Sequence, residues 1–170
     1  MLTLLIILFL LLSAVFSGSE IAYVSANKLR VELKKKRGTR RSRILAGWYE
    51  RPADFLSTML VGNNIALVVF TSLIEIPLTA LVAPWVGMDQ DNLWLLLVNS
   101  ILILPIVLIF GEYFPKTLFR LYADDALYFL AGPLRALQWL LYLPSRLMTG
   151  TSNLVLRLFF KRPSEELDNV

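Results

Sequence analysis

Three long apolar segments dominate the pattern of hydrophobic and polar positions along this chain. They cover residues 2–24, 55–82 and 93–121, and each reaches the ~20 residues that a helix needs to cross the hydrocarbon core of a bilayer. Apolar blocks of this length are typical of membrane-spanning helices, whereas soluble cores show shorter periods. The pattern therefore predicts an all-α membrane protein with three transmembrane helices.

Each apolar segment is interrupted by a cluster of small or oxygen-bearing residues. The three clusters are Ser17-Gly18-Ser19-Glu20, Gly62-Asn63-Asn64 and Gly111-Glu112-Tyr113-Phe114-Pro115-Lys116. Polar groups at membrane depth are costly unless they face other protein groups or an aqueous cavity. Three interrupted helices therefore predict a polar site inside the membrane.

Prolines are expected to disturb the second and third segments. In the third, Pro105 and Pro115 cannot donate a backbone hydrogen bond and should kink the helix, and Pro115 leaves the Gly111 carbonyl without its usual donor. The second segment is longer than one crossing requires. Its excess length allows a tilted helix, a local unwinding at residues 62–64, or an end that leaves the hydrocarbon near Pro77 and Pro84.

A fourth apolar run, residues 126–148, is not expected to cross the membrane. Gly132, Pro133 and Pro144 interrupt it, and polar side chains recur every three or four positions. These polar positions are Arg135, Gln138, Tyr142, Arg146, Thr149, Asn153 and Arg157. A polar stripe at helical spacing favours amphipathic helices in the membrane interface. We therefore expect cytoplasmic juxtamembrane helices over about 126–160, bent at Pro144.

The charge distribution indicates how the segments are oriented. Residues 28–51 carry ten Lys and Arg and two Glu, a net charge of +8 in a chain whose total is +4. Short basic connections stay on the cytoplasmic side. We therefore expect a plasma-membrane protein with its N-terminus outside the cell and its C-terminus in the cytoplasm. The acidic connection 87–92 suits an outside loop. A basic segment between two apolar runs favours contact with the lipid bilayer, and no nucleic-acid partner is expected.

The first segment also has small residues at positions 13–17 that would suit signal-peptide cleavage. No Lys or Arg precedes the segment, however, and ten follow it, which is the reverse of a secretory signal. Residues 2–24 are therefore expected to remain as the first transmembrane helix of a multi-pass protein.

The composition restricts the chemistry of the predicted site. The chain has no Cys and no His, so thiolate chemistry, disulfides, imidazole catalysis and Cys/His zinc sites are excluded. The carboxylates of the apolar segments, Glu20, Glu75 and Glu112, form no catalytic constellation, so an enzyme is not expected. Hydroxyl, amide, carbonyl and carboxylate oxygens suit a hard cation. On residue chemistry alone, Na⁺, Mg²⁺ and a proton relay stay open.

Structural explanations exist for the same residues. Glu112 and Lys116 stand four positions apart, in the order that favours an ion pair on a helix. Small residues let helices pack closely, and Asn63 and Asn64 can form hydrogen bonds between helices. Each explanation suffices for one cluster, whereas a cation site accounts for all three.

The three clusters, in this order and at this spacing, resemble the transmembrane domain of the CNNM/CorC (cyclin M) magnesium transporters. The resemblance rests on Ser17-Gly18-Ser19-Glu20-Ile21-Ala22, Leu60-Val61-Gly62-Asn63-Asn64 and Gly111-Glu112-Tyr113-Phe114-Pro115-Lys116. It covers roughly residues 1–160, the predicted transmembrane domain. It implies a homodimer of three-span protomers that transports Mg²⁺, with export of Mg²⁺ coupled to Na⁺.

The resemblance also implies which residues hold the ion. The implied metal ligands are a hydroxyl of Ser17 or Ser19, an amide oxygen of Asn63 or Asn64, the Gly111 carbonyl and Glu112, with Ser17, Asn64, Gly111 and Glu112 preferred. Three further residues, Glu20, Pro115 and Lys116, are expected to support the site. Of these, Pro115 would keep the Gly111 carbonyl free, and Lys116 would have a structural or an electrostatic role.

Members of this family continue into paired cytosolic CBS domains. Residues 161–170 are polar and are expected to begin a linker to such domains in a truncated chain. Two other functions are compatible with the same residues: a membrane-embedded Mg²⁺ sensor or scaffold that does not transport, and a structural dimeric anchor in which the polar residues only join helices.

Overall fold

The computed structural model describes residues 1–27, 29, 33, 36, 38–87 and 92–160. Its helices are α1 (Leu2–Ser25), α3 (Arg40–Glu50), α4 (Pro52–Val86), α5 (Leu93–Ile106), the π-helix η1 (Val107–Tyr113), α6 (Phe114–Leu121), α7 (Ala123–Leu140) and α8 (Tyr142–Phe160). Among these residues no strand occurs, which confirms the predicted all-α class.

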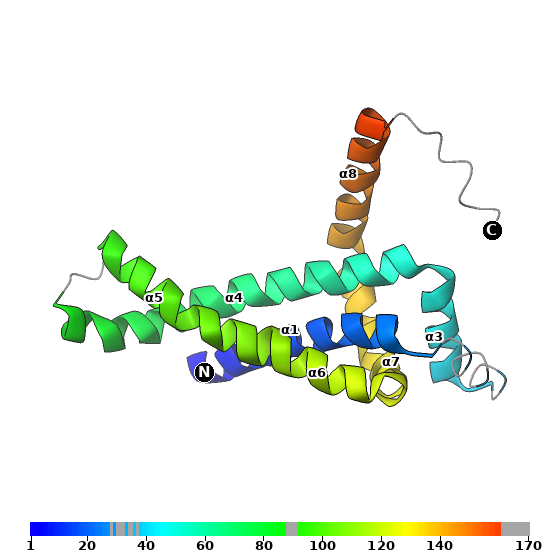
Figure 1. The fold of residues 1–170 in the computed structure, drawn as a ribbon, viewed down its shortest axis with the longest axis horizontal. Helices are drawn as coiled ribbons and strands as arrows, with labels where there is room; N and C mark the ends of the chain where they lie inside the picture. Colours follow the sequence, from blue (N-terminus) through cyan, green and yellow to red (C-terminus); the bar gives the residue numbers. More distant parts are fainter. Residues whose placement is uncertain (28, 30–32, 34–35, 37, 88–91, 161–170) are drawn as a thin grey trace.

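Three helical stretches are long and apolar enough to cross a membrane. They are Leu2–Ser25, Pro52–Val86 and Leu93–Leu121, the last formed by α5, η1 and α6 in succession. The three run side by side, while α3 and α7 gather at one end and α8 stands across the direction of the spans (Figure 1). We call this the basic end, because α3, which carries Arg40, Arg41 and Arg43, lies there.

The first span, α1, occupies the centre of the bundle. It packs against α4 on one side and against η1 and α6 on another, and it also contacts α7. Contacts between α4 and α5 join the other two spans. A polar group on α1 can therefore meet groups from both of the other spans.

The second span is one continuous helix of 35 residues. It continues through Gly62, Asn63 and Asn64, so the local unwinding that the sequence allowed at these residues does not occur. Pro77 and Pro84 also lie inside the helix, which ends at Gly87, where the backbone is left-handed (φ 67°) and the N–H donates to the Ala83 carbonyl at 3.0 Å. A C-terminal glycine in this conformation is a common helix stop. The first span is likewise continuous through its polar cluster.

The backbone of the third span departs from α-helical geometry at η1. The N–H of Phe114 donates to the carbonyl of Ile109, five residues earlier, instead of four. Pro115 follows directly and has no N–H to give to Gly111, so a wider turn at this point absorbs the mismatch. The third span is therefore interrupted in its backbone, and the first two only in the polarity of their sequence.

The juxtamembrane region consists of two helices that separate at Leu141 and not at Pro144. Leu141 has φ −90° and ψ 7°, and α8 begins at Tyr142. The predicted bend at Pro144 is therefore wrong by one turn. Proline lacks an N–H and is accommodated in the first turn of a helix, where that donor has no intrahelical partner.

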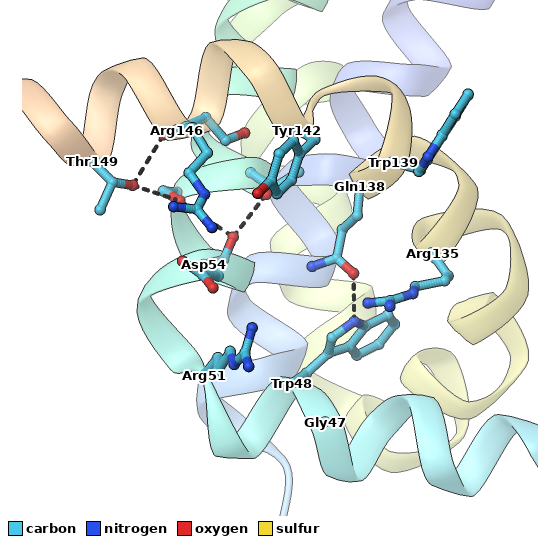
Figure 2. Close-up of a pocket in the computed structure, with 13 residues that line it drawn as sticks. Gly47, Trp48, Arg51, Asp54, Arg135, Gln138, Trp139, Tyr142, Arg146 and Thr149 are labelled. Carbon is cyan, nitrogen blue, oxygen red and sulfur yellow. Dashed lines mark hydrogen bonds between the residues drawn. The ribbon is translucent and has the colours of Figure 1, made fainter. Parts of the chain in front are cut away.

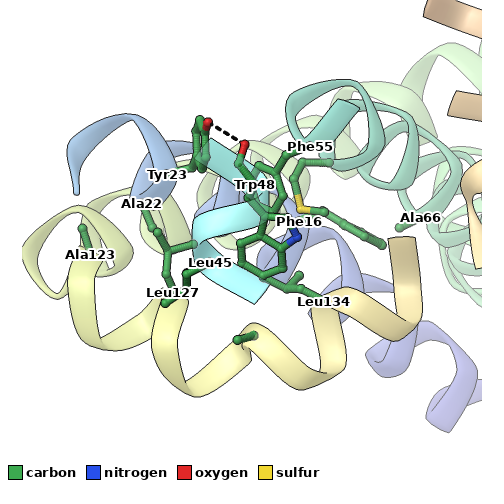
Figure 3. Close-up of a cluster of buried hydrophobic side chains, with 12 residues drawn as sticks. Phe16, Ala22, Tyr23, Leu45, Trp48, Phe55, Ala66, Ala123, Leu127 and Leu134 are labelled. Atoms are coloured by element: carbon green, nitrogen blue, oxygen red, sulfur yellow. Dashed lines mark hydrogen bonds between the residues drawn. The ribbon is translucent and has the colours of Figure 1, made fainter. Parts of the chain in front are cut away.

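The apolar core lies at the basic end, where α3 and α7 pack onto the spans (Figure 3). Tyr23 stacks on Tyr49 with ring centroids 4.6 Å apart, and Trp48 lies 4.5 Å from Phe55. The Tyr23 hydroxyl donates to the Trp48 carbonyl, and the Tyr49 hydroxyl donates to the Tyr23 carbonyl, each at 3.1 Å. Burial, and then the neighbouring Tyr23 and Asp124, raise the pKa of Tyr49 to about 12, so its hydroxyl remains a donor at neutral pH.

Candidate cation site between the spans

Residues from all three spans meet at Ser13, Asn63 and Gly111. The Ser13 hydroxyl donates to the Asn63 side-chain oxygen at 2.7 Å, and both residues are buried. Gly111, in η1, is also buried and lies next to Ser13: a Cβ at Gly111 would be 3.4 Å from the Ser13 Oγ. A Cβ at this distance would be in ordinary van der Waals contact, so the π-helical backbone lies next to α1 without a steric need for glycine.

Ser17 extends this group along α1. It follows Ser13 by four residues, so the two hydroxyls occupy the same face of the helix. Ser17 has an exposed fraction of 0%, and its Oγ has no hydrogen-bond partner. A buried hydroxyl without a partner is unfavourable. We refer to Ser13, Ser17, Asn63 and Gly111 as the polar cluster.

Ser19 is also fully buried and without a hydrogen-bond partner. Two residues advance an α-helix by about 200°, so Ser19 points away from Ser17. The intervening Gly18 faces α6, because a Cβ there would lie 2.6 Å from the Phe119 ring. The two serines therefore do not face one common site.

The two asparagines of α4 are separated in the same way. Asn63 is buried in the polar cluster, whereas Asn64 lies on the exposed surface of the chain. Consecutive helical residues differ by about 100°, so only one of them can face α1. The structure brings Asn63 into contact with the first span, and ligation by Asn64 stays a prediction.

Glu112 follows Gly111 directly in η1 and forms the predicted ion pair with Lys116. The Lys116 Nζ is 3.6 Å from the Glu112 Oε2, and the two side chains are 41% and 34% exposed. Pro115 is buried, and Glu20 is half-buried. Glu20 follows Ser17 by three residues and so shares the face of the cluster, one turn nearer the basic end. In the described part of the chain no three acidic residues come close enough to hold a metal.

Ser13 is the cluster residue that the sequence motifs do not include. Its position four residues before Ser17 was the available signal, because that spacing repeats one helix face. A second polar contact was also not foreseen: the Asn99 amide donates to the Thr79 hydroxyl at 2.7 Å between α5 and α4, and the buried Asn99 Oδ1 has no partner.

The polar cluster contains the ligand types that a hard cation accepts. It consists of two serine hydroxyls, an amide oxygen and the backbone of Gly111 in η1, and Glu112 follows Gly111 in the sequence. These are the ligand types that Na⁺, Mg²⁺ and Ca²⁺ accept, and they hold no soft donor. An ion would also supply a partner for the Ser17 hydroxyl.

Fold and cluster together define an integral membrane protein with an oxygen-lined site between its spans. Residues 4–169 match the family described as Cyclin M transmembrane N-terminal domain, and the chain belongs to this family. The family resemblance of the three motifs is thereby confirmed. The family is associated with divalent-cation transport, which points to a transporter-type membrane protein.

Relatives occur in several bacteria. The chain is 29% identical over 144 residues to the UPF0053 inner membrane protein YfjD of Escherichia coli K12, covering 81% of this chain and 32% of that protein. It is 30% identical over 137 residues to a UPF0053 protein of Haemophilus influenzae, covering 81% and 30%. A UPF0053 protein of Synechocystis is 35% identical over 124 residues, covering 65% and 26%. The chain thus spans about a third of these relatives' length or less.

Proposed function

We propose that this domain binds Mg²⁺ at the polar cluster and carries it across the membrane by opening the cluster to one side at a time. The observation that carries this proposal is the Ser17 hydroxyl, which is fully buried, has no partner, and lies one turn from the Ser13–Asn63 hydrogen bond. Backbone irregularity at membrane depth occurs in transporters where a helix exposes carbonyls to an ion.

The ligand types favour Mg²⁺ over Ca²⁺. Ca²⁺ takes about six to eight oxygens and commonly several carboxylates, whereas Mg²⁺ takes six and retains some of its water. The cluster offers neutral oxygens and one neighbouring carboxylate, Glu112. Water or a second protomer would complete the shell of a Mg²⁺ ion held there.

Export of Mg²⁺ driven by Na⁺ entry is the direction that the family resemblance supports. We place the N-terminus outside and the basic end of the bundle in the cytoplasm, because residues 28–51 carry a net charge of +8. A homodimer and cytosolic CBS domains in a longer protein complete this proposal. The exposed Asn64 would then face the partner protomer or the ion path.

The test is Mg²⁺ flux into proteoliposomes that contain a Mg²⁺-sensitive dye. Wild type should show flux, and Ser17→Ala should reduce it at least tenfold because one ligand is lost. Ser72→Ala is the matched control, since the Ser72 hydroxyl donates to the Val68 carbonyl of its own helix at 2.8 Å, outside the cluster. Equal flux in wild type and Ser17→Ala would overturn the proposed site.

A second candidate function is a Mg²⁺ sensor or scaffold that binds without transport. The observation in its favour is the pairing of Glu112 with Lys116, which leaves little free negative charge to balance a divalent ion. Saturable Mg²⁺ binding, together with no flux through the same protein, would favour the sensor over the transporter.

A further inference from the structure

A cavity of about 310 Å³ lies at the basic end, away from the polar cluster. The last turns of α3, the first turns of α4, the end of α7 and the start of α8 enclose it (Figure 2). Its volume falls at the lower end of the range for small-molecule sites, about 300–1,000 Å³. The proposed transport function assigns no role to this cavity.

The cavity is strongly basic. Arg51, Arg135 and Arg146 line it from three different parts of the chain (Figure 2), and Asp54 is the only carboxylate among its lining residues. Within the described residues none of the three arginines forms an ion pair with a carboxylate; Arg146 instead lies 5.2 Å from the centre of the Tyr142 ring. Three guanidinium groups around one space suit a phosphate, which they can bind through paired N–H donors.

The floor of the cavity is fixed by hydrogen bonds. The Trp48 Nε1–H donates to the Gln138 Oε1 at 2.6 Å (Figure 2). Because an indole N–H can only donate, Gln138 must turn its oxygen toward Trp48, which leaves its amide N–H groups for the cavity. Thr58 and Ser145, both buried, complete the polar floor. Gln138 thus supplies neutral donors at the floor, whereas the Thr58 and Ser145 hydroxyls already donate to backbone carbonyls four residues earlier.

The residues around the cavity are typical of a membrane surface. Arg51 directly precedes α4, so it marks the end of the second span. On the neighbouring α7 and α8, large apolar side chains are exposed, with Trp139 83% and Leu143 70% accessible. Arginine beside exposed tryptophan and leucine is typical of the interface between headgroups and acyl chains. Five residues of the polar stripe predicted from the sequence line this cavity: Arg135, Gln138, Tyr142, Arg146 and Thr149.

We infer that this cavity binds the phosphate of an anionic phospholipid headgroup. The three arginines hold the phosphate, while the apolar side chains of α7 and α8 contact the acyl chains. The three arginines and the Asp54 carboxylate give the lining a net charge of +2. This charge favours a headgroup of net negative charge over a zwitterionic one. A bound lipid would join α3, α4, α7 and α8 at the basic end.

Native mass spectrometry of the detergent-purified chain tests this inference. Dioleoylphosphatidylglycerol should remain bound at least several-fold more than dioleoylphosphatidylcholine, which carries the same acyl chains and no net charge. Arg135→Gln combined with Arg146→Gln should lower phosphatidylglycerol retention about tenfold or more, because each basic residue contributes to the attraction. Arg120→Gln, an exposed arginine of α6 outside the cavity, is the matched control and should retain the lipid.

Three outcomes would overturn the inference. Equal retention of the two lipids by wild type would contradict the inference. This comparison needs no variant, so it remains valid even if the double variant does not fold. Unchanged retention in a folded double variant would place the lipid elsewhere. Displacement of phosphatidylglycerol by millimolar inorganic phosphate would show a site for free anions and not for lipid.

Discussion

At the scale of single residues, the unusual feature of this protein is a pair of buried serine hydroxyls without partners. Ser17 and Ser19 are both fully inaccessible, and both Oγ atoms lack a hydrogen bond. Ser17 shares a face of α1 with Ser13, whose hydroxyl donates to Asn63 of α4, whereas Ser19 points away. If burial alone explained the two serines, their Ala variants would behave alike, whereas a cation at the polar cluster would make them differ.

Thermal unfolding of Ser17→Ala and Ser19→Ala, with and without Mg²⁺, measures that difference. Without Mg²⁺ each variant should be at least as stable as wild type, by up to about 1 kcal/mol, because an unsatisfied buried hydroxyl is removed. Added Mg²⁺ should raise the Tm of wild type and Ser19→Ala but not of Ser17→Ala, since a ligand stabilises only the state that binds it. The same Mg²⁺ shift in both variants would contradict the assignment of Ser17.

The sequence identified most of the cluster but did not select the asparagine that the structure places there. Its motifs contained Ser17 and Asn63, each with a nearby residue of the same type, Ser19 and Asn64, and the sequence favoured Asn64 over Asn63. The rotation of each helix about its axis determines which of two such residues faces the cluster. This rotation depends on packing between helices, which the spacing of residues within one helix does not reveal. Ser13 was missed for the same reason, because only its contact with Asn63 shows its role.

At the scale of helices, the position of every span could be predicted from apolar length, and the details of backbone geometry could not. Hydropathy placed the three spans, and the absence of an N–H in Pro115 indicated a disturbed third span. The missing N–H does not by itself specify the geometry of the disturbance, which the structure shows to be a π-helix over Val107–Tyr113. The break at Leu141 likewise depends on how α7 and α8 dock, which the position of Pro144 alone does not fix.

Helix packing at Gly18 leads to a prediction of its own. A Cβ at Gly18 would lie 2.6 Å from the Phe119 ring, so Gly18→Ala should destabilise the α1–α6 contact by about 1–3 kcal/mol. Gly132→Ala is the matched control: nothing lies within 4 Å of its Cβ position, and it should stabilise α7 by about 0.5–1 kcal/mol. Chemical denaturation in detergent measures both, and a Gly18→Ala variant as stable as wild type would rule out the close approach of α1 and α6.

At the scale of the whole molecule, the basic end and the opposite end of the bundle differ in charge and in structure. The basic end holds α3, α7, the aromatic core and the arginine-lined cavity, whereas the last turns of α4 and the first turns of α5 lie at the opposite end (Figure 1). The proposed orientation places the basic end in the cytoplasm, where anionic lipids and soluble domains would meet it.

Cysteine labelling tests this orientation cleanly, because the chain has no Cys of its own. Gly150 follows Thr149, whose hydroxyl contacts Ser57 near the start of α4, whereas Trp85 lies at the far end of α4, and both positions are exposed. A membrane-impermeant maleimide added to intact cells should label Trp85→Cys only, and inside-out vesicles should give the reverse. Labelling of Gly150→Cys from outside would invert the topology.

The central claim is that the three spans together hold a Mg²⁺ ion, and calorimetric titration of Mg²⁺ into the detergent-purified chain tests it most directly. Wild type should give a saturable heat of binding, and Ser17→Ala, which breaks no hydrogen bond of the fold, should lose most of it. Absence of binding by folded wild type, or unchanged binding in Ser17→Ala, would contradict a Mg²⁺ site at the polar cluster.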